Sequence, residues 1–322
     1  MTTPTVPGFV CAYLFDTEGR GRLLQESAVG DAMSRDAGWV WLHLNLADWR
    51  CRRWLGDLLN LPRDLITEFA DPPSRQHVSA WQDVLFGHLS DFLREFDADS
   101  TEFAWLHFIL GNRVLITGRG RAVQSAEKIR SLINAGFPFA APDLLLSRLL
   151  EHYTDTLDGA LHRLNDELEA IEDHVLDERH RGERQRLMLT RRETAQLHRH
   201  MRAMRRALQT AERASIPTPQ GFATTAARLV QLDQDFEEME HRARFFHDEI
   251  DAKLAAETNK QLFILSALTA AFLPPTLVAG LFGMNLQGIP FEGQHWGFWG
   301  AVGLSVMSSG AVILYLRYLG RS

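Results

Sequence analysis

The chain has 322 residues, of which 45% are apolar and 23% charged, a composition typical of a folded protein. Its net charge of -7 gives no general attraction to nucleic acid, and its 2 cysteines are too few for a disulfide scaffold or a cysteine-rich metal site. We therefore expect no nucleic-acid partner. The first residues lack the basic flank and apolar run of a secretory signal, so we expect the N-terminus to remain in the cytoplasm.

The first 142 residues alternate between strand-like and helix-like patterns and predict a cytoplasmic α/β domain over 1–142. Gly111 and Asn112 are typical of a hairpin turn, and Pro138 and Pro142 bracket a linker at the end of the domain. The expected strands are 9–15, 39–46, 84–89, 103–110 and 114–117, and the expected helices include 49–59 and 122–134.

Residues 143–260 predict a cytoplasmic helical hairpin and stalk. Asp143 is the expected N-cap of a helix over 144–178, and a second helix covers 183–212. A third helix begins near Thr224 and meets no Gly or Pro until Pro274, so it continues into the apolar C-terminal region. About sixty helical residues would extend roughly 90 Å, which is far more than one bilayer.

Charge is segregated along the first two of these helices. Residues 164–178 are acidic, whereas 179–206 are rich in arginine. The arginine run alone permits a nucleic-acid interpretation, but no aromatic residues are interleaved with it, so we favour an antiparallel hairpin whose charged helices face each other or a neighbouring subunit. For His198 and His200 we expect a solvated face rather than joint metal ligation, since they point to different sides of a helix.

Two faces can be distinguished on the third helix. Apolar residues at alternating spacings of three and four predict a coiled-coil seam that promotes oligomerisation: Leu229, Leu232, Phe236, Met239, Ala243, Phe246 and Ile250. On another face, Glu238, His241 and Asp248 form a candidate zinc vestibule, with a simple exposed stalk face as the alternative. A histidine there could also serve proton coupling, because the unperturbed pKa of the histidine side chain, about 6.5, lies in the physiological range.

Residues 261–322 predict a two-helix transmembrane domain. Residues 262–284 and 296–316 are uncharged and of spanning length, and Trp and Tyr flank the second run. The alternative is a pair of buried helices in a soluble core. Lys253, Lys260, Arg317 and Arg321 flank the two runs, whereas the connecting loop has no Lys or Arg, so we expect a multi-pass protein with both termini in the cytoplasm. The predicted fold class is therefore an α+β membrane protein.

A single two-helix hairpin cannot enclose a water-filled path, so conduction requires a homo-oligomeric pore. Polar side chains would offer oxygen atoms to an ion and leucines would form constrictions, and the alternative is that these polar groups only hold helices together. Pro274 and Pro275 would bend the span. The candidate pore-lining residues are Asn259, Leu262, Thr269, Leu273, Thr276 and Gly280.

The sequence Gly283-Met284-Asn285 at the outer end of the first span, after a long stalk and an α/β domain, resembles the CorA superfamily of divalent-cation transporters. The continuation Gly288-Ile289-Pro290-Phe291-Glu292 and the segment at 39–45 are similar to its zinc-transporting ZntB branch. The resemblance implies a homopentamer in the inner membrane that moves Zn²⁺ as its substrate, inward and coupled to protons. It also makes Gly283, Met284 and Asn285 the selectivity motif at the entrance.

Two alternatives remain open at this point. One is a Mg²⁺ or Co²⁺ channel of the same superfamily, and the other is a non-conducting, membrane-anchored coiled-coil scaffold or sensor. The chain has no phosphate-binding loop of the GxxxxGK type, no HExxH motif and no nucleophile elbow. We therefore expect neither an enzyme nor a bound cofactor.

Overall fold

A computed structural model describes residues 6–34, 37–59, 61–94, 102–176, 182–213, 218–284 and 295–319. The chain divides into two compact units, Met1–Phe245 and Phe246–Ser322. The long helix α7 (Gln220–Phe282) contributes to both. The division of the chain into segments 1–142, 143–260 and 261–322 stays a prediction.

The first unit contains a seven-stranded mixed sheet. β3 pairs with β7 in parallel, and the other neighbouring strands pair antiparallel. All the predicted strands are present, whereas the sequence interpretation missed the two edge strands, which are short. The order across the sheet is β2 (Gly21–Leu23), β1 (Phe9–Phe15), β3 (Trp39–Asn45), β7 (Val114–Arg119), β6 (Phe103–Gly111), β5 (Val84–Phe92) and β4 (His77–Trp81).

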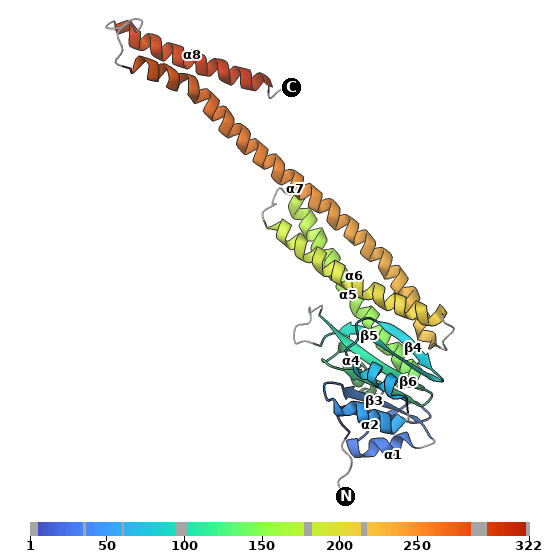
Figure 1. Cartoon of the computed structure of the whole chain (residues 1–322). Helices are drawn as coiled ribbons and strands as arrows, with labels where there is room; N and C mark the ends of the chain where they lie inside the picture. The colour runs from blue at the N-terminus through green and yellow to red at the C-terminus, as the bar shows by residue number, and fades with distance from the viewer. Residues whose placement is uncertain are drawn as a thin grey trace. The chain divides into compact units, whose positions relative to one another are not determined.

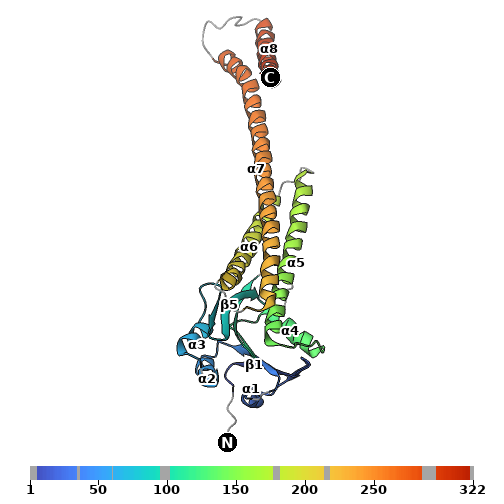
Figure 2. The same cartoon turned by 90° about the vertical axis from the view of Figure 1, so that its right-hand side faces the viewer.

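Helices cover both faces of this sheet (Figure 2). Alternation along β3 explains the two layers, since successive side chains point to opposite faces. Val40, Leu42 and Leu44 join the core formed with the N-terminal helices, while Trp39 points the other way and donates from Nε1 to the Phe139 carbonyl oxygen at 3.0 Å. One layer holds η1 (Glu26–Ala28), α1 (Val29–Met33), α2 (Arg50–Leu59) and α3 (Arg63–Ala70), and the other holds α4 (Gln124–Asn134) and α5 (Pro142–Leu176).

Two predicted helix starts are shifted. α5 begins at Pro142, so Asp143 lies in its first turn and is not the N-cap. Proline suits this position because the first helical N–H has no partner within the helix. α7 begins at Gln220 and not near Thr224, because Gly221 is accommodated inside its first turn. α6 (Glu183–Arg213) closely matches its predicted range.

In the first unit, α5, α6 and the first part of α7 lie side by side (Figures 1 and 2). Ion pairs join them across their charged faces. Arg186 of α6 contacts Glu167 of α5 at 2.9 Å, and Arg163 of α5 contacts Glu193 of α6 at 2.8 Å. The prediction that the acidic and basic helices face each other is therefore confirmed within one chain.

The apolar seam of α7 is filled by the same chain in the first unit. Leu229 and Phe236 are fully buried, and Met239 is 1% exposed. The Thr194 hydroxyl of α6 lies 3.7 Å from the Met239 sulfur, and the His198 ring stacks on Phe236. The prediction that this stretch serves as a coiled-coil contact between subunits is therefore wrong, because spacing alone does not reveal which helix covers a seam.

The prediction of a solvated face also fails for His198, which is 4% exposed. Its Nδ1 lies 2.8 Å from Glu240 and its Nε2 lies 2.8 Å from Asp233, so both ring nitrogens face carboxylates. Asp233 also accepts from Arg202 at 2.8 Å and from Arg205 at 2.6 Å. The acidic partners come from α7, and the sequence of α6 alone could not reveal them.

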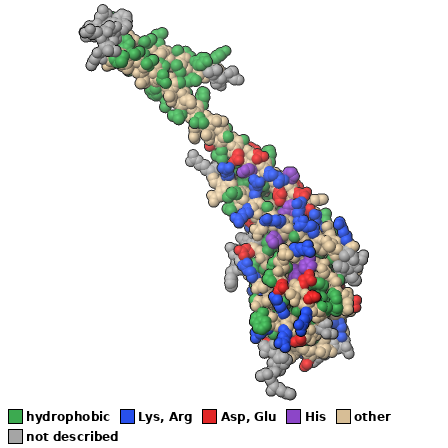
Figure 3. Space-filling model, in the orientation of Figure 1, with side chains coloured by type: hydrophobic (Ala, Val, Ile, Leu, Met, Phe, Trp, Pro, Cys, Tyr) green, Lys and Arg blue, Asp and Glu red, His purple; other side chains and the backbone are tan. Residues whose placement is uncertain are grey.

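The second unit contains the rest of α7 and α8 (His295–Leu319). Among the described residues, two helices are long and apolar enough to cross a membrane, and 6% or less of their most apolar stretches is buried. Figure 3 shows hydrophobic side chains covering this part of the chain. A buried pair of helices in a soluble core would be shielded, so this exposure favours the membrane interpretation.

Candidate functional site

In the second unit, α8 runs beside the end of α7 (Figures 1 and 2). Small residues on both helices are half-buried at this contact, as expected where membrane helices approach closely. On α7 the half-buried positions are Ala267, Ala270, Ala271, Pro274, Pro275 and Val278, and on α8 they include Ala301, Ser305, Ser308, Ser309, Val312 and Leu316.

A serine of α8 satisfies a carbonyl that the prolines release. Pro275 has no N–H, so the carbonyl of Ala271, four residues earlier, lacks its helical donor. The Ser309 hydroxyl donates to this Ala271 oxygen at 2.8 Å. In lipid an unsatisfied carbonyl is costly, so this bond lets α7 continue through its two prolines and fixes α8 against one face of α7.

The candidate pore-lining residues lie on the opposite face of α7. At about 100° per residue, they cluster on the side away from the face that α8 covers. Every member of the set is exposed: Asn259, Leu262, Thr269, Leu273, Thr276 and Gly280. The structure thus brings the set together on one uncovered stripe, and the role of this stripe as a pore lining stays a prediction.

The threonine hydroxyls on this stripe are already oriented by their own helix. Thr269 Oγ1 donates to the Leu265 carbonyl at 2.9 Å, and Thr276 Oγ1 donates to the Phe272 carbonyl at 2.7 Å. Each hydroxyl proton is therefore used within the helix, and the oxygen lone pairs remain as acceptors. Such a surface can accept from the water shell of a cation or contact the cation directly.

The structure describes two residues of the candidate entrance motif, Gly283 and Met284. The Gly283 N–H donates to the Ala279 carbonyl at 2.9 Å, and a Cβ at Gly283 would lie 2.9 Å from the same oxygen. A side chain at this position would therefore require the helix end to shift. Met284 is 44% exposed. Asn285 and Glu292 lie outside the described residues.

The candidate zinc vestibule is an exposed stretch of α7. Glu238, His241 and Asp248 are all exposed. Within the parts of the chain that the structure describes, no group of three or more His, Cys, Asp and Glu side chains is arranged to hold a metal ion. Metal binding by these three residues stays a prediction.

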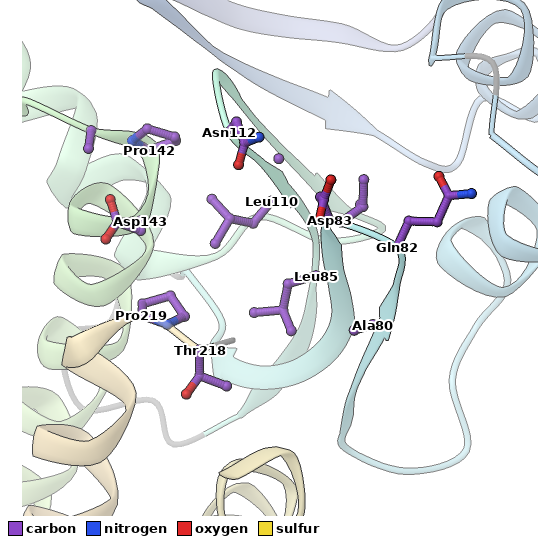
Figure 4. A pocket seen from close by; sticks show the side chains of 13 residues that line it. Ala80, Gln82, Asp83, Leu85, Leu110, Asn112, Pro142, Asp143, Thr218 and Pro219 are labelled. Carbon is purple, nitrogen blue, oxygen red and sulfur yellow. The ribbon is translucent and has the colours of Figure 1, made fainter. Parts of the chain in front are cut away.

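A cavity of about 330 Å³ lies in the first unit between two sheet hairpins and the start of α5 (Figure 4). Its charged lining residues are Asp83, on the turn between β4 and β5, and Asp143 of α5. Figure 4 shows these carboxylates on different walls. No His, Cys, Lys or Arg is among the described residues that line it.

The segment at 39–45, part of the family resemblance, contains a buried polar network. Arg119 donates to His43 Nε2 at 3.1 Å, so the other ring nitrogen carries the proton and donates to Thr117 Oγ1 at 2.7 Å. Burial, together with the positive charge of Arg119, lowers the pKa of His43 to about 3. His43 is therefore neutral at physiological pH and has a structural role on the sheet.

Sequence comparison identifies relatives along nearly the whole chain. The family model described as "CorA-like Mg2+ transporter protein" matches residues 36–318. "Zinc transport protein ZntB" of Enterobacter sp. (strain 638) is 26% identical over 317 residues, which are 97% of this chain and 95% of the relative. The protein of the same name in Cronobacter sakazakii (strain ATCC BAA-894) is 27% identical over 300 residues, covering 91% of this chain and 90% of that one.

Solved structures share the fold at lower identity. The full-length CmaX protein aligns with a TM-score of 0.80 and 19% identity, covering 100% of this chain and 99% of CmaX. The CorA magnesium transporter from Methanocaldococcus jannaschii aligns with a TM-score of 0.72 and 20% identity, covering 96% and 98% of the two chains. The likeness therefore extends over both units.

Proposed function

Because this chain belongs to the CorA-like Mg2+ transporter family, whose members carry divalent cations, we propose that it moves Zn²⁺ across the inner membrane. The proposed direction is inward, with coupling to protons, and the proposed assembly is a homopentamer with both termini in the cytoplasm. The observation that carries the pathway is the uncovered stripe on α7, opposite the face that packs against α8.

A pathway along this stripe requires several copies of the chain. Two helices leave no water-filled space between them, so the exposed Thr269, Leu273 and Thr276 need neighbouring copies to enclose a path. Arranging five α7 helices around one axis, with the stripe inward, would place α8 on the outer side. The apolar surface of α8 would then face lipid.

The chemistry of the stripe suits a hydrated cation. The lone pairs of Thr269 and Thr276 and the amide of Asn259 are acceptors, whereas Leu262 and Leu273 would form apolar constrictions that close by dewetting. At the outer end, the Asn285 carbonyl would hold part of the water shell of the ion. No positively charged side chain occurs between residues 261 and 316, which favours cations over anions.

Two observations support zinc as the substrate. Two curated relatives that match over more than nine-tenths of the chain are named as zinc transport proteins. The exposed His241, with Glu238 and Asp248 on the same helix, offers the imidazole and carboxylate groups that zinc accepts when cysteine is absent. His241 is also our candidate for the proton-coupled step.

The second candidate substrate is Mg²⁺, because the matching family model is described by that ion. Magnesium prefers oxygen ligands and keeps most of its water, so transport of Mg²⁺ would use Thr269, Thr276 and Asn285 without His241. His241→Gln should therefore impair zinc uptake but leave magnesium flux unchanged.

The decisive experiment uses the full-length protein in liposomes loaded with a zinc-sensitive dye. We expect zinc uptake that increases when a proton gradient is imposed, and loss of uptake in Asn285→Ala with the oligomer intact by native mass spectrometry. Gln287→Ala, which alters a nearby amide outside the tripeptide, is the matched control and should transport normally.

Uptake of Mg²⁺ that does not depend on pH would support the second candidate, and absence of any flux would support the scaffold. Normal transport by Asn285→Ala would contradict the entrance assignment.

A further inference from the structure

Three histidines form one row across the β4 edge of the sheet. His77 of β4 pairs with His88 of β5, which pairs in turn with His107 of β6. The ring centroids of His77 and His88 are 4.9 Å apart, and those of His88 and His107 are 4.6 Å apart. β4 is the outermost strand, so the row begins at a partly exposed His77 and continues to a buried His88.

The hydrogen-bond partners of these rings assign their protons. His77 Nε2 lies 2.8 Å from the Glu68 carboxylate, and His88 Nε2 lies 3.4 Å from the Phe69 carbonyl oxygen. Both partners are acceptors, so in each neutral ring Nε2 carries the proton and Nδ1 has the free lone pair. Burial lowers the pKa of His88 to about 3, which keeps this ring neutral.

The two free lone pairs lie close together. His77 Nδ1 and His88 Nδ1 are 3.5 Å apart, at the outer limit for a hydrogen bond, and neither has a proton to give in this tautomer. A zinc ion with tetrahedral angles and Zn–N bonds of about 2.05 Å would hold two nitrogens about 3.3 to 3.4 Å apart. The observed separation therefore matches that of two ligands that share one metal ion.

Two neighbouring side chains and an adjoining cavity provide the other features of a metal site. Glu68 would orient His77 as a carboxylate behind a metal-bound imidazole commonly does. His107 donates from Nδ1 to the Phe69 carbonyl at 2.6 Å and packs edge-on against the His88 ring, which fixes its orientation. An open cavity of about 350 Å³ borders His77 and His88 and has room for the waters that would complete the coordination.

We propose that His77 and His88 form a binding site for a transition-metal ion of the zinc class in the first unit. The two Nδ1 atoms bind the ion, water fills the remaining positions, and Glu68 and His107 position the two rings. Imidazole ligands select zinc, cobalt or nickel over magnesium. With two protein ligands the site exchanges its ion readily. The proposal goes beyond the transport pathway and does not depend on which ion the pore carries.

The test uses the full-length protein in detergent and a readout resolved by residue, because zinc also binds elsewhere in a zinc transporter. Diethyl pyrocarbonate modifies accessible imidazoles, and mass spectrometry of peptides locates the product. We expect zinc to protect His77 and to leave His162 unprotected, since the side chain of His162 is 78% exposed and outside the site. Magnesium at the same concentration should not protect His77. Equal protection by magnesium, or no protection by zinc, would overturn the proposal.

Equilibrium dialysis of variants gives an independent measurement. His77→Gln should bind one zinc ion fewer per chain than the parent protein, whereas His162→Gln should bind the same number. Glu68→Gln alters an exposed position and should retain the fold while weakening binding about 10- to 100-fold. An unchanged zinc count in folded His77→Gln, or unchanged affinity in Glu68→Gln, would count against the site. Because His77 lies outside the proposed pore, the proposed function predicts normal zinc uptake by His77→Gln, so the two proposals can fail separately.

Discussion

The helix α7 contains two stretches whose apolar side chains differ in how far they are exposed. Between Leu229 and Ala243, apolar residues recur at every third or fourth position and are 0–3% exposed. Between Leu262 and Phe282, apolar residues occur on all sides, and the leucines and phenylalanines there are 38–62% exposed. Both stretches belong to one continuous helix.

The difference shows which parts are complete in a single chain. In the first stretch the apolar side chains are covered and Asp233 is paired with Arg202 of α6, so substitutions there should change the free energy of unfolding. The second stretch is uncovered in the single chain, and under the proposed function lipid and further copies of the chain cover it, so substitutions there should change transport.

The largest expected effect is the dependence of stability on pH in the first unit. His43 has a pKa lowered to about 3 by burial, compared with about 6.5 in the unfolded chain. The folded state binds this proton less readily, so the stability from His43 is complete above about pH 6.5 and is lost as the pH falls, by up to about 1.4 kcal/mol per pH unit. We expect a loss of about 3 kcal/mol between pH 6.5 and pH 4 from this group.

The pKa shift of Asp91 makes the stability change with pH in the opposite direction. Burial raises its pKa to about 6, although Ser125 donates to its carboxylate through both backbone and side chain. Its stabilising contribution is complete at low pH and is lost as the pH rises toward 6, so it offsets part of the acid loss. In denaturant titrations with a chelator present, His43→Gln should flatten the pH profile and Asp91→Asn should steepen it. An unchanged slope in His43→Gln would contradict the assignment.

The next effect concerns the charge cluster between α6 and α7. Asp233→Ala removes the acceptor shared by His198, Arg202 and Arg205, and it should destabilise the first unit by about 3 kcal/mol, since cations in a largely buried site lose their partner. Glu237 also contacts Arg202, but its side chain is 54% exposed. Glu237→Ala is the matched control and should cost less than about 1 kcal/mol. Equal losses in the two variants would show that burial does not decide the effect.

Sequence reasoning succeeded where the signal is local. The uncharged runs from residue 262 and from residue 296 specify helices of spanning length, and the helix over 183–212 has both its ends marked by nearby residues. The central strands have strongly apolar sequences. These features depend on neighbours in the chain, so composition and periodicity are sufficient to predict them.

The features that sequence reasoning missed depend on register or on distant partners. His198 is buried because acidic residues 35 and 42 positions later reach both its nitrogens. The histidine row arises only when β4, β5 and β6 are aligned. A two-residue turn at Gln82 and Asp83 would have predicted the first pair of this row, because such a turn places His77 opposite His88. In the structure, Gln82 has the positive φ of 52° that such turns require.

A moderate effect is expected on the uncovered stripe of α7. Leu273→Ala should widen the apolar constriction and raise basal ion flux severalfold in liposomes without changing the unfolding of the first unit, because Leu273 is 62% exposed in the single chain. Leu268 lies about 140° around the helix from Leu273 and is 54% exposed. Leu268→Ala should leave flux unchanged. A larger increase from Leu268→Ala would place the pathway on another face.

The smallest effect tests the contact that orients the stripe. Ser309→Ala removes the donor to the Ala271 carbonyl, and interhelical hydrogen bonds in membranes contribute about 0.6 kcal/mol on average. We expect a loss of that size in the stability of the reconstituted second unit, together with a modest fall in transport. Ser308 donates to the Ser305 carbonyl of its own helix, so Ser308→Ala is the matched control. Since Pro275 leaves the Ala271 carbonyl without a helical donor, Pro275→Ala should restore that donor, and the penalty of Ser309→Ala should largely disappear in the double variant. A penalty of the same size in both backgrounds would show that Ser309 acts through packing alone.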